Sequence, residues 1–450
     1  MLILPCVIIF RQEDLLQIYR KHLKMNELAE TTFRHPLAAA IIFAVTFILI
    51  SFRRLSILPI GRPSSALLGA VLMVAFGVVT PKEAYELVNW DTICLLLGMM
   101  IVAEHLRSAG LFEKITAKLE AFDKPFVLLV VVAFSAAILS SILVNDPVCV
   151  VFTPLVLLLC HKKHLNPLPF LIVLATSSNI GSSLTLTGNP QNMIIGNVSK
   201  LGFLHFLKLM LLPFLAGMTI NLGLAWLFYG KKLSLDSAPA EIKAADALVS
   251  NEEDHPLKTR RLRIGIFGLI VTCLGFVTGC SMAFSALAGA VIVITFHRKD
   301  PGEILEKLDW SLLMFFSALF VVIGGLQTSG LANAIAKWSL ELISGELTRQ
   351  IWIFSGVTLV GSNLLSNVPF VLLASHSVPS LGNPELFWCL LAFVSTIAGN
   401  LTIFGSVANM IVAETAGDRC KISFWEFARF GIPSTLLCIS IGVLILSFIL

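Results

Sequence analysis

The sequence predicts an all-α polytopic membrane protein, built from two inverted repeats that contain discontinuous helices. Hydrophobic residues make up 56% of the 450 residues and charged residues only 13%, whereas soluble domains carry about 25% charged residues. The mean hydropathy is +0.88, and several motifs of the first half recur in the second half. No soluble core could bury so much apolar surface, so a lipid bilayer is the expected solvent of the helices.

Composition and motifs exclude several classes of function. The net charge is only +4, and Lys and Arg are scattered between apolar segments, so no nucleic-acid partner is expected. The nine cysteines form no CxxC pair, and no metal site is predicted. The ATP-binding motif GxxxxGKS/T and the hydrolase motifs HExxH and GxSxG are absent. We therefore expect no enzyme, no catalytic residue and no cofactor. Energy for work across a membrane would come from an ion gradient or from a separate ATPase subunit.

The chain divides into four parts. Residues 1–34 form an N-terminal segment of uncertain structure, and the polar residues 231–263 form a linker. Repeat 1 covers 35–230, and repeat 2 covers 264–450. The apolar segments within the repeats lie at 35–52, 64–79, 92–106, 127–144, 148–160, 168–198, 203–229, 264–280, 282–297, 310–327, 349–366, 368–378, 386–415 and 430–450.

Three motifs occur in the same order in both halves. The matched motifs and their offsets are Trp90…Gly110-Leu111 with Trp310…Gly330-Leu331 (220), Asn145-x-Pro147 with Asn367-x-Pro369 (222) and Thr185…Asn192 with Thr402…Asn409 (217). A nearly constant offset indicates an internal duplication.

Two pairs of apolar segments are interrupted by an Asn close to a Pro. We interpret 127–144 with 148–160, and 349–366 with 368–378, as re-entrant hairpins that enter and leave on one side. Each half then has five crossings besides its hairpin. Because five is odd, the second half enters from the opposite side, which makes the repeats inverted, as in many secondary transporters.

The distribution of Lys and Arg predicts the orientation. The side that carries the linker holds 22 basic residues, and the other side holds five when 1–34 are left out. Basic loops are mostly cytosolic, so the linker is predicted to be cytosolic. Ten crossings would place 1–34 outside. The alternative is that an extra N-terminal crossing has been degraded or is missing here.

Helices are predicted to break at four places, two in each half. Breaking a helix in lipid is costly unless the break lines a cavity or is buried in protein. Half-helix N-termini suit an anion, and freed carbonyls suit a cation. The alternative is that small residues only allow close packing of helices. The candidate substrate- or ion-binding residues are Asn145, Asp146, Asn179, Ser182, Ser183, Thr185, Gly188, Asn189, Asn192, Ser366, Asn367, Gly399, Asn400, Thr402, Gly405 and Asn409.

Asp146 is the only carboxylate at the four breaks. An intramembrane carboxylate is a functional candidate, and we expect Asp146 to carry a coupling proton or to help hold a coupling cation. The alternative is that it caps the helix after Pro147. Asp91 and Asp309 are expected to be N-terminal helix caps. Glu104, His105 and Glu414 are expected near the membrane surfaces.

Six stretches of the chain resemble members of one superfamily of transporters. VNDP at 144–147, ATSSNIGSS at 175–183, GNPQN at 188–192 and AGNLT at 398–402 are similar to the ion transporter superfamily, with its citrate-transporter-like domain. That group contains arsenite antiporters, sodium/proton antiporters and divalent anion/sodium symporters. LPIGRP at 58–63, with LLGAVLM at 67–73, resembles the plant silicon efflux transporters and the bacterial anion permeases.

The resemblance implies a site at the middle of the membrane, a proton- or sodium-coupled cycle and, often, a homodimer. Both hairpin tips lack the Thr of the Ser-Asn-Thr tip found in the symporters, and the four breaks contain no Arg or Lys. A neutral or weakly charged oxyacid, such as silicic or arsenous acid, is therefore a better expected substrate than citrate.

The sequence thus predicts a secondary active transporter, in the plasma membrane, that exports a small oxyacid or oxyanion in exchange for H⁺ or Na⁺. One alternative is sodium-coupled uptake of a carboxylate or sulfate, and another is sodium/proton exchange. A channel or a membrane scaffold would be the non-transporting alternative.

Overall fold

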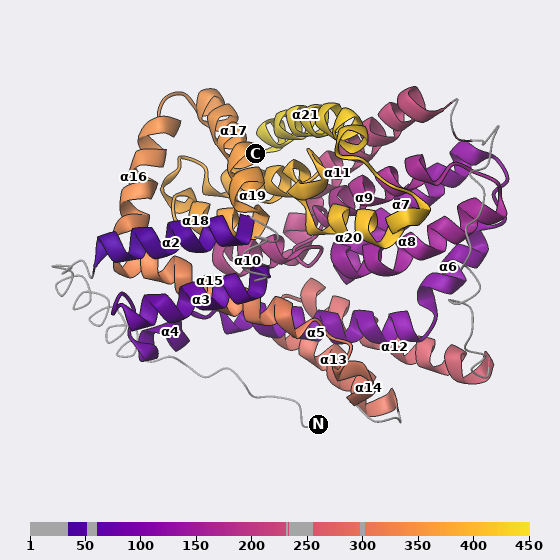
Figure 1. Cartoon of the computed structure of the whole chain (residues 1–450), viewed down its shortest axis with the longest axis horizontal. Helices are drawn as coiled ribbons and strands as arrows, with labels where there is room; N and C mark the ends of the chain where they lie inside the picture. The colour runs from indigo at the N-terminus through magenta and orange to yellow at the C-terminus, as the bar shows by residue number, and fades with distance from the viewer. Residues whose placement is uncertain (1–34, 52–60, 231–232, 234–254, 298–301) are drawn as a thin grey trace, which may run out of the picture.

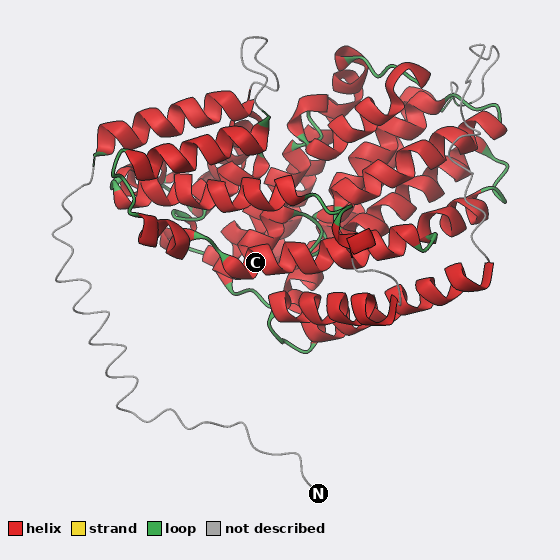
Figure 2. Ribbon diagram, turned by 60° about the horizontal axis from the view of Figure 1, so that its bottom comes forward, coloured by secondary structure: helices red, strands yellow, loops and turns green. Residues whose placement is uncertain are grey.

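The computed structural model describes residues 35–51, 61–230, 233, 255–297 and 302–450. The segment 1–34 and most of the predicted linker lie outside the described residues. Within these ranges every regular element is a helix (Figures 1 and 2). The prediction of an all-α membrane protein with discontinuous helices is confirmed.

The helices of the first half run from α2 to α11. They are α2 (Pro36–Ser51), α3 (Arg62–Ala75), α4 (Pro81–Leu87), α5 (Trp90–Ser108), α6 (Leu111–Leu119), α7 (Pro125–Leu143), α8 (Asn145–Lys162), α9 (Pro167–Ser182), α10 (Pro190–Ser199) and α11 (Phe203–Tyr229).

The second half repeats this order, with three short 3₁₀ turns added. Its elements are α12 (His255–Val277), α13 (Met282–His297), α14 (Gly302–Leu305), α15 (Trp310–Thr328), α16 (Leu331–Ile343), α17 (Leu347–Leu365), α18 (Asn367–Ala374), η2 (Val378–Ser380), α19 (Pro384–Ala398), η3 (Ile403–Gly405), α20 (Val407–Ala416), η4 (Gly417–Arg419) and α21 (Phe424–Ile449).

Local backbone features recur at the offsets found in the sequence. Gly110 and Gly330 precede α6 and α16 in the left-handed conformation, with φ of 81° and 77°. Val144 and Ser366, where each hairpin turns, have φ of 71° and 70°. The opposite orientation of the two halves in a membrane stays a prediction.

The pair α2–α3 in the first half and the equivalent pair α12–α13 in the second half make the same close contact. A Cβ atom on Gly69 of α3 would lie 2.2 Å from Oγ1 of Thr46 on α2, and one on Gly289 of α13 would lie 2.0 Å from Oγ1 of Thr272 on α12. The two glycines belong to SALLGAV at 65–71 and SALAGAV at 285–291, a further match at an offset of 220. Only glycine permits these approaches without displacing a neighbour.

Helices of both halves mix in two groups. In the first group, α3 packs on α15, α5 packs on α13, and α2 and α12 cover them. In the second group, α9 and α19 are buried along almost their whole length and are surrounded by α7, α11, α17 and α21 (Figure 1). The functional site lies where these two groups meet.

Three predicted boundaries are wrong. The first hairpin does not have two short arms, because α7 has 19 residues and α8 has 18, with Pro154 inside α8. The second hairpin is unequal, since α18 has only eight residues. The linker is shorter than predicted, because α12 already begins at His255.

The described helices include fewer obvious spans than the ten predicted crossings. Five helices (α7, α8, α11, α15 and α21) are long and apolar enough to cross a membrane, and the bent pair α4–α5 gives a sixth. Four shorter apolar helices are α2, α3, α13 and α19. Whether the hairpins re-enter on one side therefore stays a prediction.

Candidate functional site

The hairpin tips place two equivalent asparagines at the starts of helices. Val144 and Ser366 each turn the chain by a positive φ, and α8 and α18 begin directly afterwards at Asn145 and Asn367. A positive φ is rare for a β-branched residue such as valine. Such strain costs about 1–3 kcal/mol and collects at functional sites.

The chain unwinds between α9 and α10, and asparagine side chains take over the lost backbone hydrogen bonds. Nδ2 of Asn192 donates to the carbonyls of Ser182 (3.3 Å) and Thr185 (2.9 Å). Asn189 caps α10 by accepting from the Asn192 amide at 2.9 Å. Gly188 passes so close to Ser182 that a Cβ atom would lie 2.2 Å from its carbonyl oxygen. The free carbonyls of the broken helix are thus paired, as burial requires.

The same arrangement lies 217 residues further on, between α19 and α20. Nδ2 of Asn409 donates to the carbonyls of Gly399 (2.7 Å) and Thr402 (3.0 Å). Oγ1 of Thr402 accepts from the Gly405 amide at 3.1 Å. A Cβ atom on Gly405 would lie 2.8 Å from the Gly399 carbonyl. The two copies of the motif therefore have the same local structure.

Asn179 of α9 joins the two halves through its side-chain amide. Its Oδ1 accepts from Nδ2 of Asn145 (3.0 Å) and from Oγ of Ser406 (3.0 Å). Its Nδ2 donates to Oδ1 of Asn400 (2.8 Å) and of Asn409 (2.9 Å). All five side chains are buried. One amide thus connects the first hairpin tip to the second unwound segment.

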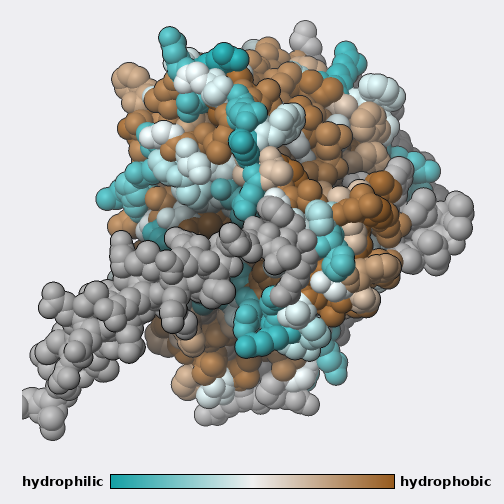
Figure 3. All heavy atoms as spheres, turned by 90° about the vertical axis from the view of Figure 1, so that its left-hand side faces the viewer, coloured by the Kyte–Doolittle hydropathy of each residue, from teal (hydrophilic) through white to brown (hydrophobic). Residues whose placement is uncertain are grey.

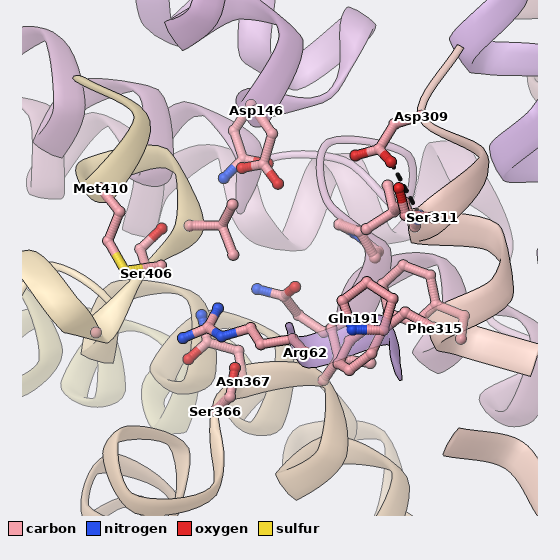
Figure 4. Close-up of a pocket in the computed structure, with 18 of the residues that line it drawn as sticks. Arg62, Asp146, Gln191, Asp309, Ser311, Phe315, Ser366, Asn367, Ser406 and Met410 are labelled. Atoms are coloured by element: carbon pink, nitrogen blue, oxygen red, sulfur yellow. Dashed lines mark hydrogen bonds between the residues drawn. The ribbon is translucent and has the colours of Figure 1, made fainter. Parts of the chain in front are cut away.

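A cavity of about 840 Å³ lies beside this network, between the two helix groups (Figure 4). Both hairpin tips line it, with Asn145 and Asp146 from the first and Ser366 and Asn367 from the second. The remaining wall comes from the starts of α3, α10 and α15 and from one side of α20.

Most of the other predicted site residues do not line this cavity. Gly405 does, but Thr185 and Thr402 do not. Oγ1 of Thr185 donates to the Ser141 carbonyl at 2.5 Å, and Oγ of Ser183 donates to the Ile180 carbonyl at 2.7 Å. These hydroxyls bond the start of the unwound segment to α7 and to the end of α9.

Two amide oxygens at the tips have no hydrogen-bond partner in the described part of the chain. They are Oδ1 of Asn145 and Oδ1 of Asn367, both buried. An unpaired buried acceptor costs about 1–3 kcal/mol. This cost is offset when a bound ligand donates a hydrogen bond to the oxygen. The two equivalent tips therefore offer acceptors, which suit a hydroxyl-bearing solute or a cation.

The cavity carries more charge than the sequence predicted. Arg62 reaches it from the start of α3, and its guanidinium points toward the second hairpin tip (Figure 4). Asp309 and Glu414 line it together with Asp146. Two sequence signals pointed to Arg62: its place in LPIGRP at 58–63, a stretch that carries the family resemblance, and its position beside Pro63 at the start of an apolar segment.

The predictions for the other charged residues have mixed outcomes. Oδ1 of Asp309 accepts from the Leu312 amide at 3.1 Å, so its predicted cap is confirmed. Asp91 is not the cap of α5, because Asn89 accepts the Thr92 amide. Glu414, which was predicted near a membrane surface, also lines the cavity.

The position near a membrane surface stays a prediction for His105, but its side chain does not extend out of the protein. His105 is fully buried, because α12 covers this face of α5. Its Nε2 lies 2.9 Å from the Arg261 carbonyl of α12.

Asp146 has no capping role in the described structure. It lies in the first turn of α8, and no side chain caps that helix. Its carboxylate interacts electrostatically with Asp309 and Arg62. The capping alternative is therefore not supported, and the carboxylate faces the cavity.

The fold is that of an integral multi-pass membrane protein with a buried polar site. Residues 45–388 match the family model described as citrate transporter, and the chain belongs to that family.

Two relatives resemble the chain over nearly its full length. The silicon efflux transporter LSI3 of Oryza sativa is 33% identical, over 90% of this chain and 96% of its own. A protein of Dictyostelium discoideum named as transporter arsB is 32% identical, over 91% of this chain and 92% of its own.

Two solved structures share the fold at only 14% identity. The YdaH transporter of Alcanivorax borkumensis matches with a TM-score of 0.54, over 92% of this chain and 98% of its own. MtrF of Neisseria gonorrhoeae, from a class of antimetabolite efflux pumps, matches with a TM-score of 0.57, over 94% and 97%.

Gly188→Ala is expected to destabilise the protein by about 1–3 kcal/mol or more, because the added methyl meets a backbone oxygen that cannot move aside. Gly223→Ala on α11 is the matched control, since no atom lies within 4 Å of the added Cβ. Thermal unfolding in detergent measures both. Equal melting temperatures would show that the first unwound segment is not packed as described.

Proposed function

We propose that this protein is a secondary active transporter that exports a small neutral or weakly charged oxyacid, of the silicic or arsenous acid type, in exchange for a cation. The observation that carries the proposal is the pair of unpartnered amide oxygens, on Asn145 and Asn367, at the two hairpin tips of one cavity. An undissociated oxyacid carries hydroxyl groups, which can donate hydrogen bonds to these two amide oxygens.

The charges of the cavity support a neutral substrate over a multivalent anion. Three carboxylates, on Asp146, Asp309 and Glu414, line it with one guanidinium, on Arg62. Like charges repel strongly in a medium of low dielectric constant. The carboxylates of Asp146 and Asp309 would repel citrate, whereas they would not repel silicic acid. The names of the relatives, a silicon efflux transporter among them, agree with this substrate class.

In this proposal, Asp146 is the residue that binds the coupling ion, H⁺ or Na⁺. A carboxylate near the middle of a membrane is energetically unfavourable, and such carboxylates mark ion and proton pathways. A carboxylate that takes up a cation on one side and releases it on the other suffices for exchange. Sodium/proton antiport is the second candidate function, and the three acidic side chains favour it.

The cavity is proposed to open to the cytosol. The starts of α3 and α15, which line it, belong to the side that the Lys and Arg count assigns to the cytosol. A homodimer and residence in the plasma membrane remain part of the proposal.

A flux screen in proteoliposomes tests the substrate class. The full chain is reconstituted, and arsenite, silicic acid, citrate, sulfate and sodium are offered under imposed pH and sodium gradients. We expect saturable, gradient-dependent flux of arsenite or silicic acid and none of citrate. Sodium-driven citrate or sulfate uptake would instead establish a symporter, and flux that neither saturates nor responds to gradients would establish a channel.

A further inference from the structure

A row of hydroxyl groups runs along the buried face of α17. Ser355, Thr358 and Ser362 lie on successive turns of this helix, and each side chain is at most 2% exposed. Spacings of three and four residues place these side chains, the hydroxyl row, on one side of the helix. The next residue along that side is Ser366, which lines the cavity at the second hairpin tip.

The hydroxyl row has no hydrogen-bond partner in the described part of the chain. By contrast, the hydroxyls of Thr153, Thr176 and Thr272, which are also buried in helices, each donate to the carbonyl four residues earlier. That bond is the usual solution for a hydroxyl inside an apolar helix. A buried hydroxyl without a partner is destabilising, so the hydroxyl row is incomplete without a ligand.

The row follows the contact between α17 and α19. On one side of it, the ring of Phe354 packs on the ring of Phe387 of α19. On the other side, Nδ2 of Asn363 donates to the Ala398 carbonyl at the end of α19, at 3.1 Å. The hydroxyls therefore lie between two helices and not toward lipid.

In the first half, the equivalent helix pair needs almost no hydroxyls. At the offset of 222, alanines take the place of the first two hydroxyls, at 133 and 136, and both are fully buried on α7. Val144 takes the place of Ser366. Small apolar residues thus suffice to pack this helix pair, and packing alone does not explain the hydroxyls of α17.

One hydroxyl pair occurs in both halves, and it is joined in only one of them. Oγ of Ser140 on α7 lies 2.8 Å from Oγ of Ser178 on α9. Their equivalents are Ser362 on α17 and Ser395 on α19. In the described structure these two do not bond each other, and Ser395 donates to the Ala392 carbonyl of its own helix at 3.4 Å. Two polar groups beyond direct bonding distance are the usual setting for a bridging water.

We propose that α17 and α19 hold a file of water molecules, bound by the hydroxyl row, that joins the cavity at Ser366. Successive hydroxyls are about 4.5–6 Å apart along the helix axis, a gap that a bridging water spans. Toward the start of α17, the row ends at Ile351, an apolar side chain that is only 4% exposed. An apolar constriction of this kind excludes water, so the file is closed at that end in the present structure.

The water file gives a coupling proton a route between the cavity and the membrane face at the start of α17, once the Ile351 end opens. Each water or hydroxyl accepts a proton from one neighbour and releases one to the next, so the file is left neutral. Gln350, beside Ile351, supplies a further unpaired oxygen, Oε1, at that end. This use of the file rests on the proposed cation exchange, whereas the binding of water does not.

Opening the closed end tests the file. Ile351→Ser, in the full chain in proteoliposomes, is expected to let protons leak down an imposed pH gradient at least about tenfold faster than the wild type, with no substrate present. Leu129→Ser, at the equivalent position of α7, is the matched control and should leak no faster than the wild type. A pH dye trapped inside the vesicles measures the leak.

Removing the middle hydroxyl tests its part in the file. Thr358→Val keeps the size of the side chain, and in the Ile351→Ser chain it should return the leak to the wild-type level. Melting temperatures confirm folding, and Ile351→Ala replaces Ile351→Ser if the latter does not fold. A folded variant without a leak, an equal leak in Leu129→Ser, or a leak that Thr358→Val leaves intact overturns the proposal. If the leak behaves as expected but the wild type moves no solute of the panel, the proposed function fails and the water file stands.

Discussion

Replacing Asp146 by Asn is expected to reduce gradient-driven flux to the level of empty liposomes while the protein stays folded. Asn keeps the size and the capping ability of Asp but cannot bind a proton or compensate a cation. The carboxylate faces the cavity and caps nothing in the described structure. Exchange of substrate without a gradient is expected to persist. Flux and its pH dependence in proteoliposomes are the measurements.

Asp418→Asn is the matched control, since this carboxylate is almost fully exposed and, within the described part of the chain, forms an ion pair with Lys421 at 3.2 Å. It should leave flux unchanged. Wild-type flux with wild-type pH dependence in Asp146→Asn would show that coupling does not pass through this carboxylate. The coupling cation would then be held by backbone carbonyls of the unwound segments.

Replacing Asn179 by Ala is expected to cause the largest loss of stability of any single polar substitution near the site. The change leaves Asn145, Asn400, Asn409 and Ser406 without their shared partner. Each of the four buried groups left unpaired costs about 1–3 kcal/mol, so the expected loss is at least about 4 kcal/mol. Thermal unfolding of the purified protein in detergent measures it.

Asn333→Ala on α16 removes an exposed asparagine and should leave the melting temperature unchanged. A small effect at Asn179, equal to that at Asn333, would mean that the two halves are not held together by this amide.

Local sequence signals located much of the candidate site. Asn-x-Pro at both hairpin tips, and the glycines and asparagines of the unwound segments, mark places where a helix cannot continue. The duplication then identified equivalent residues, such as Asn192 and Asn409, which make the same hydrogen bonds.

Contacts between distant segments were not predictable in this way. Arg62 and Asp309 lie far from both hairpins in sequence, and only packing of α3 and α15 against the second helix group brings them to the cavity. The contacts of Asn179 were not predictable either, since its partners lie in the first hairpin tip and in the second unwound segment. The burial of His105 was not predictable either, because the sequence does not reveal that α12 covers its helix.

The central claim is that a solute crosses the membrane through the cavity that the two hairpin tips share. The most direct measurement is the initial rate of gradient-driven arsenite or silicic acid flux in proteoliposomes, for the wild type and for Asn367→Ala. We expect saturable flux in the wild type and a loss of more than about tenfold in the variant, since one contact to a bound solute is worth about 1.4 kcal/mol or more. Expression and melting temperature should stay near those of the wild type. A folded variant that transports at the wild-type rate would contradict the account.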